Sequence, residues 1–190
     1  YSLNRKDFSK AEELINTLPS SSIDKEERIA ILYTEQEKFL DALKIWEHRI
    51  LNSITEIQTA LMNMLDIAVK EERIEDADFY ADVYEQASKL FYVTPWIPYN
   101  AKLSLSVIKK NKQECLAALK STLTAMREKW KPEENPLYRH LESSETNIFS
   151  ERILSMLQEE MENGNEFTFM ESSQEYQELL QELKKHNDIE

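Results

Sequence analysis

Glycine and cysteine are almost missing from this 190-residue sequence, which contains one of each, Gly164 and Cys115. Phosphate-binding and dinucleotide-binding loops need several glycines at fixed spacings, so both are excluded. A single cysteine excludes a disulfide framework and a thiolate metal cluster. A fold rich in tight hairpins or positive-φ turns would also need more glycine. Because Glu, Leu, Lys, Ala and Gln are abundant instead, the composition predicts an all-α fold.

Long apolar runs are missing as well. No stretch approaches the roughly 18 consecutive apolar residues of a membrane span. The sequence also lacks a signal-peptide core and an Asn-x-Ser/Thr glycosylation acceptor. We therefore expect no membrane contact and a cytoplasmic location. The sequence opens at Tyr1, without a methionine and already in a helical pattern, so we expect a fragment of a longer chain.

Positive charge is scarce in the last third of the chain. Residues 1–132 carry 19 Lys/Arg against 21 Asp/Glu, whereas residues 133–190 carry 4 against 15. Nucleic-acid binding requires a cationic face for the phosphates. We therefore expect no direct contact of this chain with DNA, and we interpret the acidic end as a solvated helical face.

A small residue recurs in four helical segments, at Ala11, Ala42, Ala77 and Cys115. The intervals of 31, 35 and 38 residues bracket the 34-residue period of the tetratricopeptide repeat, whose unit is two antiparallel helices. Each small residue would lie in the second helix of a hairpin, and the first helices would occupy residues 23–37, 56–72 and 99–110. The pattern predicts a right-handed solenoid of tetratricopeptide-like helical hairpins.

The predicted solenoid covers residues 1–130, as four degenerate units of which the first is incomplete. Residues 131–190 would form a proline-containing connector and acidic capping helices at 148–162 and 172–186, in the same domain. We place Trp46 in the core, and Trp96 and Trp130 against the ends of hairpins.

Catalytic patterns are missing. The three histidines lie in separate segments, without metal-ligand spacing. Cys115 occupies a packing position, where a thiol is expected to be buried and unreactive. We therefore predict no enzyme activity, no metal and no cofactor.

Binding is expected on the concave groove of the repeat array. The phase of the first helices places six polar side chains there, and the two asparagines could each donate to and accept from a peptide backbone. The predicted peptide or protein site consists of Thr59, Asn63, Asp66, Lys70, Asn100 and Ser104.

The repeat positions Ala11, Ala30, Tyr33, Ala42 and Ala77, followed by "NPLYRHL" and "EFTFMESSQEYQELLQEL", resemble the C-terminal region of Xre-family helix-turn-helix transcriptional regulators of Firmicutes. The resemblance spans essentially the whole chain, but the DNA-binding domain that precedes this region in the family is absent from it. It implies a regulatory and dimerising domain that reaches DNA only through the missing N-terminal domain.

The resemblance also implies a homodimer and, from relatives that bind signalling peptides, a short peptide ligand. Ligand binding would change the curvature of the solenoid and so the spacing of two DNA-binding domains. The alternative is a generic interaction scaffold without a DNA-binding partner domain. A third alternative is a phosphatase that binds response regulators through helical repeats, but no specific residue in the sequence indicates it.

Overall fold

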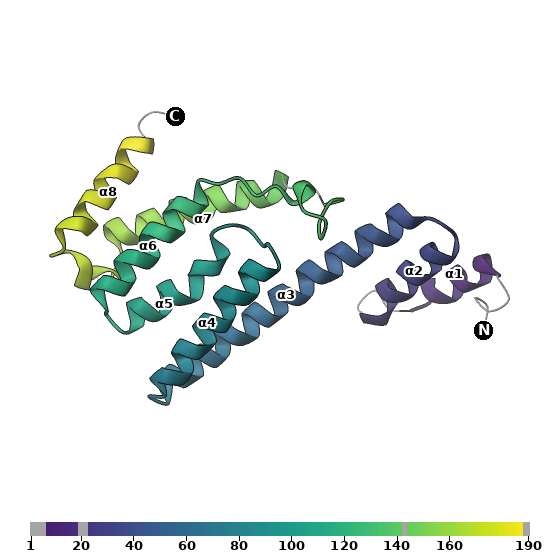
Figure 1. Cartoon of the computed structure of the whole chain (residues 1–190), viewed down its shortest axis with the longest axis horizontal. Helices are drawn as coiled ribbons and strands as arrows, with labels where there is room; N and C mark the ends of the chain where they lie inside the picture. The colour runs from purple at the N-terminus through teal and green to yellow at the C-terminus, as the bar shows by residue number, and fades with distance from the viewer. Residues whose placement is uncertain (1–6, 19–22, 142–143, 188–190) are drawn as a thin grey trace. The chain divides into compact units, whose positions relative to one another are not determined.

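The computed structural model describes residues 7–18, 23–141 and 144–187, and these form α-helices, short 3-10 helices and turns without any strand (Figure 1). The α-helices are α1 (Phe8–Asn16), α2 (Ile23–Glu35), α3 (Phe39–Lys70), α4 (Ile74–Leu90), α5 (Asn100–Ile108), α6 (Lys112–Met126), α7 (Ser144–Asn163) and α8 (Gln174–Asn187). The 3-10 helices are η2 (Ile97–Tyr99), η3 (Pro132–Glu134) and η4 (Thr168–Met170). The all-α prediction is confirmed.

The chain folds into two compact units. Unit 1 comprises Tyr1–Ser53 and Lys131–Glu142, and unit 2 comprises Ile54–Trp130 and Ser143–Glu190. The division falls within the sequence of α3, so this helix contributes residues to both units. Segments that are far apart in sequence, such as α2 and η3, therefore belong to the same unit.

The three turns that join the two helices of a hairpin repeat one geometry. Glu37, Glu72 and Lys110 each follow a helix with positive φ, at 60°, 61° and 52°. The next residue in each turn donates a backbone hydrogen bond five residues back: Lys38 to Tyr33, Arg73 to Ala68 and Asn111 to Ser106. This pattern is the Schellman motif, which satisfies carbonyls at a helix end. The expectation that positive-φ turns need glycine is therefore wrong for this chain, because non-glycine residues occupy all three positions and also the positive-φ position after α4, Tyr92.

The three turns also explain the repeated small residues. Ala42, Ala77 and Cys115 each lie five residues after a positive-φ residue, and all three are buried. A small side chain there lets the second helix of a hairpin approach the first closely. The hairpins α2/α3, α3/α4 and α5/α6 thus share a turn and a packing position, although the sequences of their helices differ.

The helix expected around Ala42 and the helix expected over residues 56–72 are one and not two, because α3 continues from Phe39 to Lys70. Residues 51–55 contain neither proline nor glycine, so nothing in the sequence stops the helix there. The buried positions Ile54 and Gln58 continue at helical spacing, and the Gln58 side chain donates to the Ser88 hydroxyl at 2.8 Å. By contrast, Pro95 and Pro98 lie between α4 and α5, where the chain does leave the helix.

Unit 1 has a small apolar core. Ala11 and Ile15 of α1 pack with Leu32 of α2. Trp46, which we expected in the core, is 36% exposed, and the Arg49 guanidinium lies 5.5 Å from the centroid of its ring. The buried residue in this turn of α3 is the neighbouring Glu47, which points about 100° away around the helix.

Unit 2 contains two apolar clusters. In the first, small residues bring α3, α4 and α5 close together; its buried members are Leu65, Ala68, Ala77, Ala81, Tyr84, Ala101 and Leu105. In the second, α7, η4 and α8 pack against α5 and α6 around Cys115, Leu119 and Tyr176. The Tyr176 hydroxyl donates to the Met161 carbonyl at 2.9 Å, which joins α8 to α7. The C-terminal helices therefore pack against the α5/α6 hairpin.

Three further expectations about unit 2 are confirmed. Cys115 is fully buried, and burial raises the pKa of its thiol, which disfavours the nucleophilic thiolate. Trp96 is buried and donates from Nε1 to the Ser150 hydroxyl at 3.0 Å. Trp130 is also buried and donates to the Tyr92 carbonyl at 3.0 Å, next to the end of α4. Both indoles therefore pack at the ends of helical hairpins.

Candidate binding groove between α4, α5 and α6

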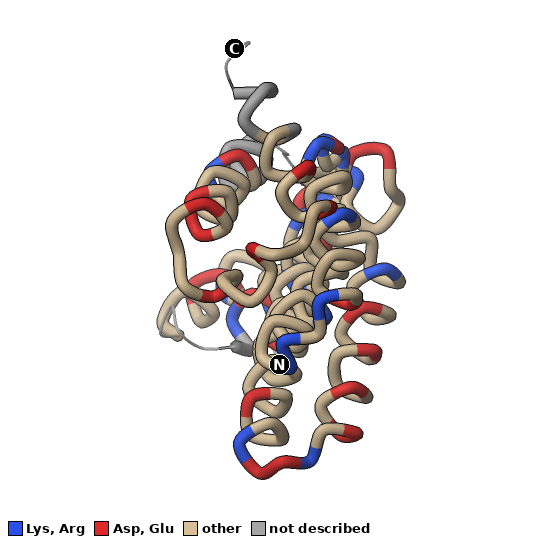
Figure 2. Tube along the Cα trace, turned by 90° about the vertical axis from the view of Figure 1, so that its left-hand side faces the viewer, with Lys and Arg blue, Asp and Glu red and all other residues tan. Residues whose placement is uncertain are grey.

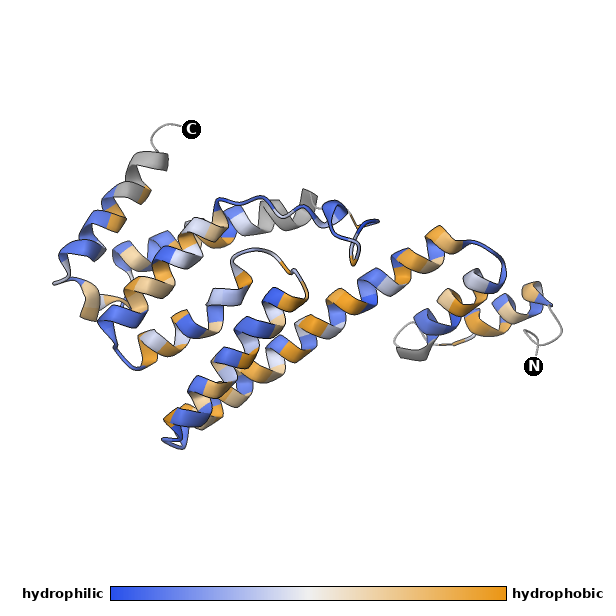
Figure 3. Cartoon of the chain, viewed as in Figure 1, coloured by the Kyte–Doolittle hydropathy of each residue, from blue (hydrophilic) through white to orange (hydrophobic). Residues whose placement is uncertain are grey.

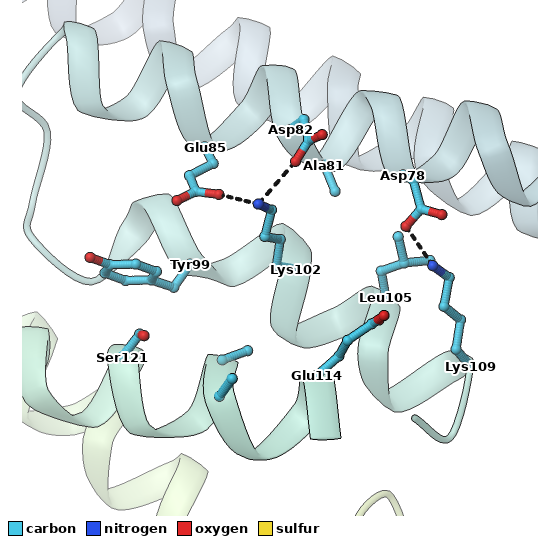
Figure 4. Close-up of a pocket in the computed structure, with 12 residues that line it drawn as sticks. Asp78, Ala81, Asp82, Glu85, Tyr99, Lys102, Leu105, Lys109, Glu114 and Ser121 are labelled. Atoms are coloured by element: carbon cyan, nitrogen blue, oxygen red, sulfur yellow. Dashed lines mark hydrogen bonds and ion pairs between the residues drawn. The ribbon is translucent and has the colours of Figure 1, made fainter. Parts of the chain in front are cut away.

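An open groove of about 570 Å³ lies in unit 2, with α5 as its floor and α4 and α6 as its walls (Figure 4). Each helix contributes residues at intervals of three, four or seven, so one face of each helix lines the groove. The lining consists of Asp78, Ala81, Asp82 and Glu85 from α4, Tyr99, Lys102, Leu105 and Lys109 from η2 and α5, and Glu114, Ala117, Ala118 and Ser121 from α6.

The α4 wall is acidic. Asp78, Asp82 and Glu85 follow one another at i, i+4 and i+7, so their carboxylates share one side of the helix. Figure 2 shows acidic positions recurring along α4 from the turn that joins it to α3. The side chains of Asp78 and Asp82 are about half exposed, at 52% and 55%, whereas that of Glu85 is only 15% exposed.

Lys102 of α5 and Lys109, the residue directly after α5, cross the groove to this wall. The Lys102 ammonium lies 2.6 Å from Glu85 and 2.9 Å from Asp82, and the Lys109 ammonium lies 2.5 Å from Asp78. In Figure 4, Lys102 points up between the two carboxylates, and the Lys109–Asp78 pair closes the opposite end from Tyr99. These pairs fasten α5 to α4 and also fix where charge lies in the groove.

The environment of Glu85 favours its charged form. Burial alone would raise its pKa, but hydrogen bonds from Lys102 and Lys89 outweigh burial, and the pKa falls below its ordinary value. The hydrogen bond to Glu85, and after it the one to Asp82, raises the pKa of Lys102. Glu85 and Lys102 are therefore both charged at neutral pH.

The remaining surface of the groove is apolar or small. Ala81, Ala117 and Ala118 leave room between the walls, and Leu105 covers the floor. Tyr99 stands at one end of the groove together with Ser121, and the Lys89 ammonium lies 5.3 Å from the centroid of its ring. Such a ring offers a flat face to an aliphatic or cationic side chain.

Acid outnumbers base in the groove, with four carboxylates and two ammonium groups in the lining. Glu114 of α6 is exposed and forms no ion pair with any residue that the structure describes. Asp78 and Asp82 each have an oxygen that the lysine contacts leave available, because a carboxylate accepts at about four sites. The groove can therefore accept further hydrogen bonds from a cationic group.

None of the six residues predicted to bind peptide lines this groove. Four of the six lie together on one exposed face of α3, namely Thr59, Asn63, Asp66 and Lys70. The Thr59 hydroxyl and the Asn63 side-chain amide each donate a hydrogen bond to a backbone carbonyl of the same helix. In α5, Asn100 is exposed and hydrogen-bonded to Tyr84, and Ser104 is half-buried. The prediction that these six residues form a peptide site stays a prediction.

A signal for the groove exists in the sequence. The stripe Asp78, Asp82, Glu85 on one helix and the pair Lys102, Lys109 on the next have matching seven-residue spans. Opposite charges at equal spacing on consecutive helices indicate that the two faces meet. The α6 residues carry no such signal, since Ala117, Ala118 and Ser121 resemble an ordinary helix surface.

Among residues 7–18, 23–141 and 144–187, no cluster of three or more His, Cys, Asp or Glu side chains is placed to hold a metal ion. Within the same ranges, no helix combines the length and the apolarity that crossing a bilayer demands. Comparisons with protein-family models, with curated proteins and with solved structures find no match to this chain.

Proposed function

We propose that this chain is a non-catalytic binding domain whose groove between α4, α5 and α6 takes a short basic peptide segment. The observation that carries the proposal is the acidic α4 wall, with Asp78 and Asp82 half exposed beside the apolar side chain of Leu105 on the floor. An arginine of the ligand would bond to these carboxylates in bidentate fashion. Its aliphatic or aromatic neighbour would lie on Leu105 and Tyr99.

The size of the groove agrees with such a ligand. Ligand sites in proteins commonly enclose about 300–1,000 Å³, and the volume here is about 570 Å³. That space holds two or three side chains of an extended segment. Because the ligand must compete with Lys102 and Lys109 for the same carboxylates, we expect modest affinity that falls as salt is added.

The wider role follows the resemblance to Xre-family regulators. In this proposal the helical hairpins stack as a right-handed, tetratricopeptide-like solenoid, and the chain is a homodimer in the cytoplasm. DNA is bound only by a further N-terminal domain. A ligand held by three successive helices would favour one arrangement of those helices, and would thereby change the geometry of the dimer and its affinity for an operator.

The groove is tested by fluorescence anisotropy with two labelled seven-residue peptides. One contains Arg, Lys and Phe, and in the other every Arg and Lys is replaced by Glu. The basic peptide should bind and the acidic one should not. The double variant Asp78→Asn/Asp82→Asn should weaken binding about tenfold, because it removes two charges from the site. The matched control Glu151→Gln/Glu159→Gln removes two exposed charges of α7, which does not line the groove, and should leave binding unchanged.

A third variant separates the two candidate surfaces. Asn63→Ala/Asp66→Asn alters the α3 face predicted from the sequence and leaves the groove intact. Loss of peptide binding in this variant, with normal binding by the groove variant, would move the site to α3. Equal weakening by all three double variants would mean that binding reflects net charge and would overturn the proposal.

The regulator role is tested by the gene itself. A reading frame that continues upstream of Tyr1 into a helix-turn-helix domain supports the proposal. A reading frame that begins directly before Tyr1 would favour the interaction scaffold without a DNA-binding domain.

A further inference from the structure

The unit 2 part of α3 exposes an apolar seam that no other described residue covers. Ile57, Met64 and Ile67 are 47%, 43% and 52% exposed, and Ala60 between them is also exposed. Figure 3 shows apolar positions recurring along α3 between polar ones. The neighbouring face of the same stretch, about 100° around the helix, is buried through Leu65 and Ala68, so the helix is apolar well beyond the face that its own fold uses.

The spacing of the seam is that of a helix that packs on another helix. Residues 57, 60, 64 and 67 alternate steps of three and four, which is the heptad spacing of the apolar positions in a coiled coil. In the unit 1 part of the same helix, Leu43, Trp46 and Ile50 keep this register. The pattern therefore indicates a helical partner for α3.

The edge of the seam is polar and has a symmetric arrangement of charge. Glu56, Asn63 and Lys70 recur every seven residues along it, and all three are exposed. The negative residue Glu56 and the positive residue Lys70 are each seven residues from the central Asn63. A surface with this arrangement is complementary to itself after a two-fold rotation.

We propose that α3 of a second copy of this chain packs antiparallel along this seam, about a two-fold axis that crosses the seam at the height of residues 62 and 63. In that register Ile57 lies opposite Ile67 of the second copy, and the small Ala60 lies opposite the larger Met64. Glu56 faces Lys70 of the second copy, twice by symmetry, and the two Asn63 amides meet near the axis, where each can donate to the other. The contact buries the exposed apolar side chains, which supplies its driving force.

This interface locates the homodimer proposed above and is independent of the peptide groove. Asn63 and Lys70, predicted from the sequence to contact a peptide, would instead flank the contact between copies. The seam and the groove are formed by different residues, so one can be altered without the other.

The first test is sedimentation velocity of the 190-residue chain between 10 and 200 µM, concentrations on the order of those at which weak dimers form. The wild type should dimerise, and Met64→Glu should weaken the dimer by roughly 100-fold, because it buries a charge at two symmetric places. Met156→Glu is the matched control: Met156 of α7 is also an exposed helical methionine, at 57%, and lies outside the seam. Circular dichroism confirms that both variants remain helical.

The second test is a charge exchange. Glu56→Lys and Lys70→Glu should each weaken the dimer by roughly fivefold, and the combined variant should restore it. The two residues are 14 positions apart in one helix, about 21 Å along its axis, so restoration can arise only between copies.

The outcomes separate the inference from the proposals on which it builds. A wild-type chain that stays monomeric at the highest concentration overturns both the homodimer and the seam. A dimer that Met64→Glu leaves intact overturns the seam alone and directs the search to other surfaces. A combined charge variant that remains as weak as the single ones overturns the antiparallel register.

Discussion

The carboxylate of Glu47 accepts two hydrogen bonds from one residue, His140. The His140 backbone N–H lies 2.8 Å from Oε2, and its Nδ1 lies 2.6 Å from Oε1. Because an ionised carboxylate only accepts, this arrangement places a proton on Nδ1. Glu47 is buried in α3, and His140 follows the fully buried Tyr138, so the pair fastens residues 131–141 to α3 within unit 1.

Glu47→Ala is expected to destabilise unit 1 by about 2 kcal/mol, because it leaves the partly buried His140 N–H without its acceptor. The matched control Glu12→Ala removes an exposed carboxylate of α1 in the same unit and should change stability by less than about 0.5 kcal/mol. Urea denaturation measures the free energy of unfolding. Hydrogen exchange at the His140 amide gives a local readout, and unchanged exchange in Glu47→Ala would contradict the assigned bond.

Non-glycine residues with positive φ at helix ends are sites where a substitution should stabilise the fold. Lys110→Gly and Glu72→Gly should each raise the unfolding free energy by about 0.5–1 kcal/mol, because a non-glycine residue at positive φ costs about 1–2 kcal/mol, partly offset by the entropy of glycine. Gln86→Gly, at an exposed position in the interior of α4, should instead lower stability by about 1 kcal/mol. Thermal melts of the three variants compare them directly. A loss of stability in Lys110→Gly would show that its side chain has a role beyond the turn.

Buried Trp96 gives a prediction for unit 2. Ser150→Ala should destabilise the packing of α7 by about 1–2 kcal/mol, since the buried indole N–H of Trp96 loses its 3.0 Å acceptor. Ser155→Ala, on the exposed face of the same helix, is the matched control. Tryptophan fluorescence during urea unfolding measures both. Equal stability of the two variants would mean that another group satisfies the indole.

The hairpins were predictable from the sequence because the turn geometry demands a small residue at a fixed place. Ala42, Ala77 and Cys115 mark that place in otherwise dissimilar helices. The continuity of α3 was missed because the repeat model requires a break after each hairpin, whereas only proline, glycine or a cap produces one. Trp46 was misplaced for a related reason: equivalence to Ala81 in the repeat does not imply that a partner helix covers it.

The groove could be predicted only in part. Its acidic wall on α4 is visible as a stripe of Asp78, Asp82 and Glu85, but an acidic stripe is also typical of a solvated helix face. The α5 lysines reach across to it only because small residues, among them Ala81 and Ala101, bring α4 and α5 close together. That distance depends on tertiary packing, which sequence spacing does not give.

The Glu85–Lys102 pair predicts how stability depends on acid. The pKa of Glu85 is lowered in the folded chain, so its contribution is complete above the ordinary pKa of an unfolded glutamate, about 4.3. It disappears as pH falls through the lower, folded pKa, where the carboxylate takes up a proton. Glu85→Gln should therefore be less stable than the wild type at pH 7 by roughly 1 kcal/mol or less, since Lys102 is partly exposed. The difference in unfolding free energy, measured by urea denaturation at pH 7, 5, 4 and 3, should shrink toward zero only at the acidic end. A difference that stays constant down to pH 3 would mean that the carboxylate charge does not stabilise the contact between α4 and α5, and that the pair contributes through packing alone.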